Sequence, residues 1–144
     1  MGSYDRIDWH YGGDFPKNLP PENGGTHIGM FLTWIIESDL IGDLHREESQ
    51  ELLQKVLNRQ ITGRDFLIEA CDEKFWEEDL NEEGNEFTKY YFDSDDGDLN
   101  YVNDYSQILG DDLESLYEVE DSWENYDKLK PILDSRYRTW RLER

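Results

Sequence analysis

The stretch from Trp9 to Trp34 constrains the fold more than any other part of this 144-residue chain. It holds two of the five Trp, two of the three His and three of the four Pro residues. Glycine adopts backbone angles that other residues avoid, proline fixes φ, and aromatic side chains bring large buried areas. This mixture is not typical of a solvated linker. We therefore expect an ordered, irregular loop over residues 3–25, clamped by aromatic rings.

The loop leads into the most apolar segment of the chain. Thr26 is a good N-cap, and the apolar residues from 26 to 40 recur with helical spacing. Helical periodicity also covers residues 47–59, 62–71 and 122–142, where Ser122 and the pair Thr62 and Asp65 provide start signals. The predicted core residues are Ile28, Phe31, Leu32, Ile35, Leu53, Val56, Phe66, Trp123, Tyr126 and Leu133.

Weaker patterns fill the middle of the chain. Phe75, Trp76 and Leu80 continue the apolar spacing of the preceding helix. Residues 86–92 and 99–109 each predict a short helix, and a strand is the alternative for the second. Few Val residues, no period-2 runs and no hairpin turns argue against a sheet protein.

These segments together predict an all-α protein. Pro131 falls inside the last helix, where it should kink the helix or divide it at Lys130. A chain of this length is expected to build one core. We therefore predict a compact single-domain helical bundle over residues 1–144, with the ordered loop at 3–25 and helices over 26–142.

The cysteine content and the hydropathy of the chain indicate in which cellular compartment the protein is expected. The single cysteine, Cys71, excludes an intramolecular disulfide, and its apolar neighbours predict a buried free thiol. His45, beside Arg46 at a helix start, is expected at the surface. The polar N-terminus does not resemble a signal peptide, and no apolar run approaches the roughly 20 residues that span a bilayer. We expect a soluble, cytoplasmic protein without a membrane partner.

The charge of the chain is strongly negative and uneven. The net charge is −21, and residues 72–127 hold 21 acidic but only two basic residues, whereas residues 128–144 hold two acidic and six basic ones. An aromatic content of 14% still favours a folded chain over a disordered one. Direct binding to nucleic acid is excluded, because phosphate would be repelled.

So much negative charge destabilises a compact state, so it calls for a reason. One interpretation is a solubilising face that the basic tail neutralises; the others are a bound cation and a basic macromolecular partner. The run Asp93–Asp98 resembles a calcium loop, but Gly97 stands at position five where an EF-hand needs glycine at six. A calcium site is therefore not expected, and no cofactor is predicted.

His10, Asp14 and His27 form the one candidate for chemistry. Two imidazoles and a carboxylate suit a metal ion, and His10 with Asp14 suits acid–base work. Their spacing matches no metal motif, and Gly12 and Gly13 do not precede a helix as a phosphate loop requires. The favoured interpretation is structural, with His10 and His27 bonding to the loop backbone, so we expect neither a catalytic nor a metal site.

Three runs resemble a known family. WHYGGDFPKNLP at 9–20, THIGMFLTW at 26–34 and LYEVEDSWENYDKLKPILDSRY at 116–137 resemble a family of small, acidic, uncharacterised bacterial proteins. Those proteins are similar to immunity proteins of polymorphic-toxin systems. The resemblance implies a cytoplasmic bacterial antidote and transfers no catalytic residue.

The sequence therefore favours a binding protein over an enzyme. We expect an immunity protein that covers a cognate basic toxin, of the nuclease type, with its acidic surface. The alternatives are a small metal-dependent or acid–base enzyme using His10, Asp14 and His27, and an acidic regulator of a basic host protein. The expected partner-binding residues are Glu77, Glu78, Asp79, Asp93, Asp95, Asp96, Asp98, Asp111 and Asp112, with Trp76, Tyr91, Tyr101 and Tyr117 as aromatic anchors.

Overall fold

A computed structural model describes residues 3–10, 15–94 and 100–143 of the chain. Within these residues the α-helices are α1 (Thr26–Glu37), α2 (Asp43–Glu48), α3 (Gln50–Leu57), α4 (Gly63–Ala70), α5 (Glu82–Tyr91), α6 (Tyr101–Leu109) and α7 (Trp123–Glu143). Two short strands, β1 (Ser3–Arg6) and β2 (Lys74–Trp76), pair with each other, and the fold is mostly helical, as predicted. No helix in the described part combines the length and apolarity that crossing a membrane requires.

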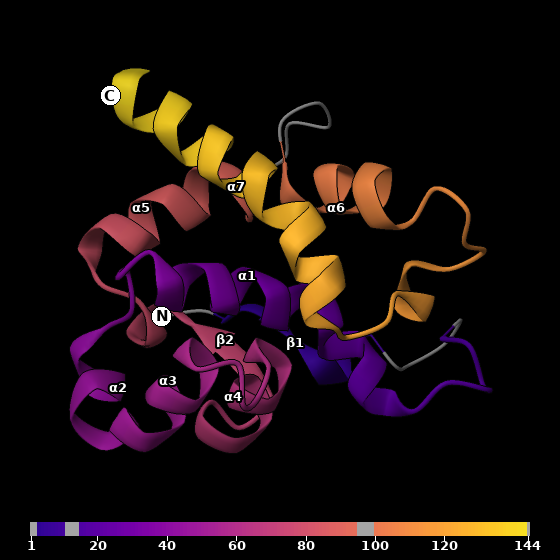
Figure 1. Cartoon of the computed structure of the whole chain (residues 1–144), viewed down its shortest axis with the longest axis horizontal. Helices are drawn as coiled ribbons and strands as arrows, with labels where there is room; N and C mark the ends of the chain where they lie inside the picture. Colours follow the sequence, from indigo (N-terminus) through magenta and orange to yellow (C-terminus); the bar gives the residue numbers. More distant parts are fainter. Residues whose placement is uncertain (1–2, 11–14, 95–99, 144) are drawn as a thin grey trace.

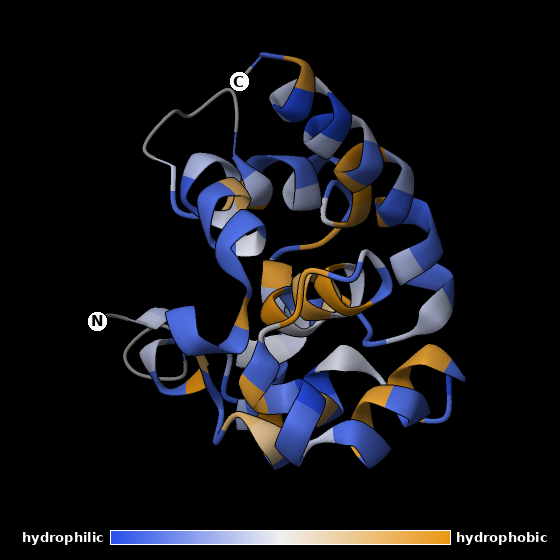
Figure 2. Cartoon of the chain, turned by 90° about the vertical axis from the view of Figure 1, so that its left-hand side faces the viewer, coloured by the Kyte–Doolittle hydropathy of each residue, from blue (hydrophilic) through white to orange (hydrophobic). Residues whose placement is uncertain are grey.

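Helix α1 forms the centre of the molecule. All of its residues from 26 to 36 are buried, because a helix that is apolar around its circumference needs protein on every side. Figure 1 shows α2, α3 and α4 on one side of α1 and α5, α6 and α7 on the other. The hydropathy colours in Figure 2 likewise gather the apolar residues in the middle of the molecule.

The core is largely the predicted one. Of the ten expected residues, nine are buried and Trp123 is half-buried beneath the guanidinium of Arg59, 4.5 Å from its ring. Phe31 is fully buried and contacts the rings of Phe92 and Tyr101 at centroid distances of 4.9 and 5.1 Å. Together with rings from β2 and α5, aromatic residues from three other elements therefore meet around this one residue of α1.

Helix α4 packs very closely on α1. A Cβ on Gly63 would overlap the carbonyl of Gly29, and one on Gly29 would overlap the backbone of Arg64. Only glycine permits this approach between the two backbones. The capping box of Thr62 and Asp65 is present as predicted and begins α4 at this contact.

The N-terminal segment was predicted as loop, and this is wrong for its first residues. β1 pairs antiparallel with β2, placing Asp5 opposite Phe75 and Arg6 opposite Lys74. β2 in turn replaces the predicted helical continuation of 62–71. Asp72 and Glu73 end that helix by adopting positive φ angles of 54° and 65°, which a helix cannot contain.

Two predicted helices are divided differently in the structure, and one open alternative is resolved. The segment 47–59 forms two helices, α2 and α3, which meet at Ser49 with a non-helical φ of −126°. Within the segment predicted as a helix or a strand at 99–109, α6 covers Tyr101–Leu109, so the strand alternative is wrong for these residues. α7 runs from Trp123 to Glu143 through the exposed Pro131 and is not divided at Lys130.

Candidate functional site

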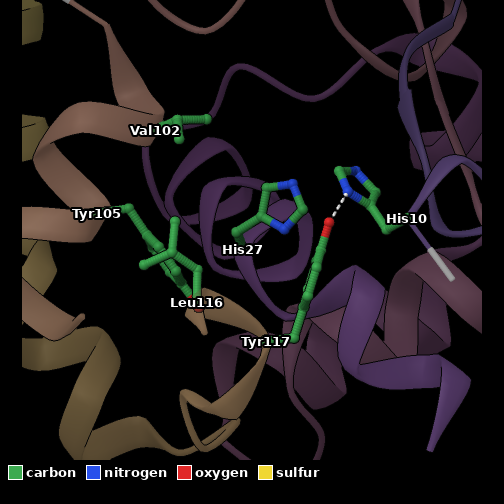
Figure 3. A pocket seen from close by; sticks show the side chains of 6 residues that line it. All are labelled: His10, His27, Val102, Tyr105, Leu116 and Tyr117. Carbon is green, nitrogen blue, oxygen red and sulfur yellow. Dashed lines mark hydrogen bonds between the residues drawn. The ribbon is translucent and has the colours of Figure 1, made fainter. Parts of the chain in front are cut away.

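A cavity of about 270 Å³ brings together four parts of the chain. Its lining residues are His10 after β1, His27 in the first turn of α1, Val102 and Tyr105 on α6, and Leu116 and Tyr117 in the segment before α7 (Figure 3). Two imidazoles therefore stand among walls that are otherwise apolar and aromatic. Both histidines were singled out by the sequence as candidates for chemistry.

Asp5 connects the two histidines. Its Oδ1 lies 2.6 Å from Nε2 of His10, and its Oδ2 lies 2.8 Å from Nε2 of His27. The backbone N–H of Arg6 donates a further hydrogen bond to Oδ1 at 2.8 Å. Burial opposes ionisation of this carboxyl, but the hydrogen bonds from the two imidazoles outweigh burial and hold the pKa of Asp5 well below its usual range. Asp5 is therefore an ionised, buried acceptor at neutral pH.

Tyr117 fixes the outer side of His10. Its hydroxyl lies 2.7 Å from Nδ1 of His10, and burial raises the pKa of Tyr117, so the phenol keeps its proton. The ring of Phe15 packs against Tyr117 at a centroid distance of 4.8 Å, and Asn23 Nδ2 donates to the Tyr117 carbonyl at 2.9 Å. The orientation of His10 is thus set from both of its ring nitrogens.

The hydrogen-bond partners of the two histidines differ from those expected. We expected His10 and His27 to bond to loop backbone, whereas both side chains bond to the carboxylate of Asp5. The predicted carboxylate, Asp14, lies outside the described residues. Sequence reasoning missed Asp5 because the β1–β2 pairing that places it beside α1 has no local signal in a four-residue strand.

An acidic loop borders the cavity. We use this name for residues 111–120, between α6 and α7, which include the cavity residues Leu116 and Tyr117. The loop closes on itself, because Gly110 lies so close to Leu116 that a Cβ would overlap its side chain. Its exposed carboxylates are those of Asp111, Asp112, Glu114, Glu118 and Glu120. The sequence has no basic residue from 90 to 127, so no Lys or Arg of this segment offsets them.

The other predicted acidic residues are scattered. Glu78 and Asp93 are exposed as expected, and Glu77 is half-buried with Lys89 3.4 Å away. Asp79 is only 3% exposed, so its assignment to a binding surface is wrong. Asp95, Asp96 and Asp98 lie outside the described residues.

Two of the four predicted aromatic anchors are also wrong. Tyr91 and Tyr101 are completely buried, because they fill the core beside α1, and the Tyr101 hydroxyl donates to the carbonyl of His27 at 2.5 Å. Trp76 and Tyr117 are half-buried. Of these two, Tyr117 lines the cavity and belongs to the acidic loop.

A second cluster lies inside the molecule, away from the cavity. His45 was expected at the surface but is 2% exposed, with its Nε2 2.7 Å from Asp79 and 3.7 Å from the sulfur of Cys71. Ser49 and the backbone N–H of Trp76 complete the hydrogen bonds of His45 and Asp79. Cys71 is buried as predicted, and burial, with the Asp79 charge, raises the pKa of its thiol. We interpret this cluster as a clamp between α2, α4 and β2.

Comparison with known proteins identifies one family to which the chain is similar. No curated protein and no solved structure matches the chain. One family matches residues 3–119, which include β1, the cavity residues and most of the acidic loop but not α7. Because the match covers most of the sequence, the chain belongs to the family described as a domain of unknown function, DUF7832.

Proposed function

We propose that this protein binds and neutralises a basic protein partner, as an immunity protein does for a toxin of the nuclease type. The observation that carries the proposal is the acidic loop, whose five exposed carboxylates border a cavity with apolar and aromatic walls. Such a surface suits a basic partner. The carboxylates attract it, and the cavity receives one of its side chains.

The two parts of this surface have different energetic roles. Exposed rim charges accelerate encounter and suppress wrong partners, while a desolvated pocket near the centre of an interface slows dissociation. Steered association reaches about 10⁸–10⁹ M⁻¹s⁻¹ and falls as salt shortens the Debye length to about 10 Å at 0.1 M. Tyr117 is suited to be the aromatic contact, since it is half-buried and held by Phe15 and His10.

The fold favours the acidic loop over the other acidic segments. Around Glu77, the nearby Lys89 offsets part of the charge, and Asp79 is buried. The acidic loop combines exposed carboxylates, a neighbouring cavity and an absence of basic residues in its own segment. It is therefore the part of the surface that we assign to the partner.

The test is binding of the toxin domain encoded by the neighbouring gene. A loop variant would carry Asp111→Asn, Asp112→Asn and Glu114→Gln. A control variant would carry Asp43→Asn, Glu47→Gln and Glu48→Gln, which remove the same charge from exposed positions on α2, far from the acidic loop in Figure 1. Association rates would be measured by stopped-flow fluorescence at low and at physiological salt.

We expect the loop variant to associate several-fold more slowly at low salt, with a weaker salt dependence, while the control variant stays close to the unaltered protein. The unaltered protein should also protect cells that express the toxin domain. Equal slowing by both variants would mean that only the total charge matters, and the assignment of the acidic loop would fall. If no basic product of the neighbouring gene binds at low salt, the immunity function itself is wrong.

A further inference from the structure

We propose that Asp5, His10 and His27 bind one divalent transition-metal ion, such as zinc, at the inner end of the cavity. The proposal goes beyond partner binding, because it concerns the buried end of the cavity rather than the exposed carboxylates at its rim. Asp5 lies in β1, His10 follows the short 3-10 helix Ile7–Trp9, and His27 lies in α1.

The donor atoms have the type and spacing that such a site needs. Two imidazole nitrogens and one carboxylate oxygen are a common ligand set for zinc and for iron(II). One ligand atom from each of the three residues can be chosen so that all lie within 4.8 Å of one another. Ligand atoms about 2.0–2.1 Å from a tetrahedral ion stand roughly 3.3 Å apart. At present the two imidazole nitrogens lie 2.6 and 2.8 Å from different oxygens of Asp5, which are hydrogen-bond distances. One of these oxygens would bind the ion, so the three ligand atoms would rearrange by about half an ångström or more as the ion replaces the hydrogen-bonded protons.

The surroundings of His10 suit a metal ligand. A histidine that binds a metal through one ring nitrogen almost always bonds through the other to a protein group, which fixes the orientation and tautomer of the ring. Nδ1 of His10 has this partner in the hydroxyl of Tyr117 at 2.7 Å, which leaves Nε2 for the ion. The carboxylate of Asp5 is likewise held from behind by the backbone N–H of Arg6.

The position of the site also distinguishes it from a purely structural cluster. Three protein ligands leave at least one coordination position open, and both histidines line the 270 Å³ cavity from which a water or a small ligand would reach the ion. His45, Cys71 and Asp79 offer donors too, but all three are buried to more than nine-tenths and their hydrogen bonds are completed by Ser49 and Trp76. They serve as the internal control.

The experiment is a zinc titration of the purified protein after removal of metal by a chelator, in competition with a chromophoric zinc indicator. We expect one zinc ion per chain and a higher melting temperature in its presence. His10→Gln and His27→Gln should each abolish this binding, with circular dichroism checking that the variants are folded. The loop variant of the binding experiment should keep it, so failure of this proposal and failure of the proposed function are distinguishable.

A more conservative variant keeps the proposal testable if the histidine variants do not fold. Tyr117→Phe keeps the ring that packs on Phe15 and removes only the hydroxyl, so it should weaken zinc binding by about tenfold, the low end of the effect of such outer partners. Cys71→Ser should leave zinc binding unchanged, and cobalt(II) bound in place of zinc should show no thiolate charge-transfer band. The proposal is overturned if neither zinc nor cobalt(II) binds at one per chain, or if binding survives both histidine substitutions. It is equally overturned if Cys71→Ser abolishes binding.

Discussion

At the scale of single residues, Asp5 is the residue on which the site depends. It is 8% exposed, yet its carboxylate is ionised because two imidazoles and a backbone N–H donate to it. A carboxyl whose pKa is lower in the folded than in the unfolded state stabilises the fold above its unfolded pKa, about 3.9 for Asp. That contribution is lost as the pH falls toward the folded-state pKa.

The expected outcome is an acid-sensitive stability that Asp5→Asn reduces. The unfolding free energy of the unaltered protein, measured by urea titration, should fall between about pH 5 and pH 3. Asp5→Asn should be less stable at neutral pH and should show a shallower fall over this range. Asp8→Asn is the control, because Asp8 is exposed, so water screens the hydrogen bond from Arg6 that lowers the pKa of Asp8. Equal slopes for the unaltered protein and Asp5→Asn would contradict this account.

The candidate site could be predicted in part from the sequence. His10 and His27 stand out because a segment rich in Gly, Pro and aromatics must be ordered, and titratable side chains inside such a segment are few. The third partner could not be found, since Asp5 reaches the histidines only after β1 pairs with a strand some 70 residues away. His45 and Asp79 were missed for the same reason, because their meeting joins two distant segments.

At the scale of elements, an ion pair with the buried carboxylate of Asp104 is one of the polar contacts that fix α7 to the rest of the molecule. Arg136 donates to both carboxylate oxygens of Asp104 on α6, at 2.9 and 3.0 Å, and the Tyr91 hydroxyl donates to the same carboxylate at 2.5 Å. Asp104 is 4% exposed, so its charge depends on these donors. Removing one partner of such a pair leaves a buried charge without compensation.

We therefore expect Arg136→Ala to lower the unfolding free energy by about 3 kcal/mol. Arg138→Ala, at an exposed position on the same helix, should cost less than about 0.5 kcal/mol. Chemical denaturation of the two variants compares the two costs directly. Similar losses would show that α7 is held by general charge attraction rather than by Asp104.

The sequence predicts the helices of this protein better than its strands. The helices α1, α4, α6 and α7 follow from apolar spacing, and the predicted caps Thr62 and Ser122 begin α4 and α7; both are local properties. The predicted cap Thr26 is wrong, since Gly25 is the N-cap of α1 and Thr26 is its first residue. The break at Ser49 and the strand β2 are set by neighbours instead. Asp72 and Glu73 turn the chain with positive φ angles that neither residue type demands, and β2 then lies beside β1.

At the scale of the whole molecule, the charge balance opposes the fold. The chain has 35 acidic and 14 basic residues, so even complete one-to-one pairing would leave 21 carboxylates without a basic partner. Arg136 and Lys130 do pair with carboxylates, yet five exposed acids still gather in the acidic loop. Mutual repulsion of these groups raises the free energy of the compact state relative to the expanded one.

Sodium chloride should therefore stabilise this protein. Salt weakens individual surface ion pairs, but here it also screens the larger repulsion among the carboxylates. Raising the salt from 0.01 to 0.1 M shortens the Debye length from about 30 to about 10 Å, so repulsion across the molecule is screened. Partly buried pairs such as Arg136 with Asp104 are screened much less. We expect the midpoint of thermal unfolding to rise by several degrees over this range. The loop variant with Asp111→Asn, Asp112→Asn and Glu114→Gln should gain stability at low salt and respond less to added salt. A midpoint that falls with salt would mean that surface ion pairs outweigh the repulsion among the carboxylates.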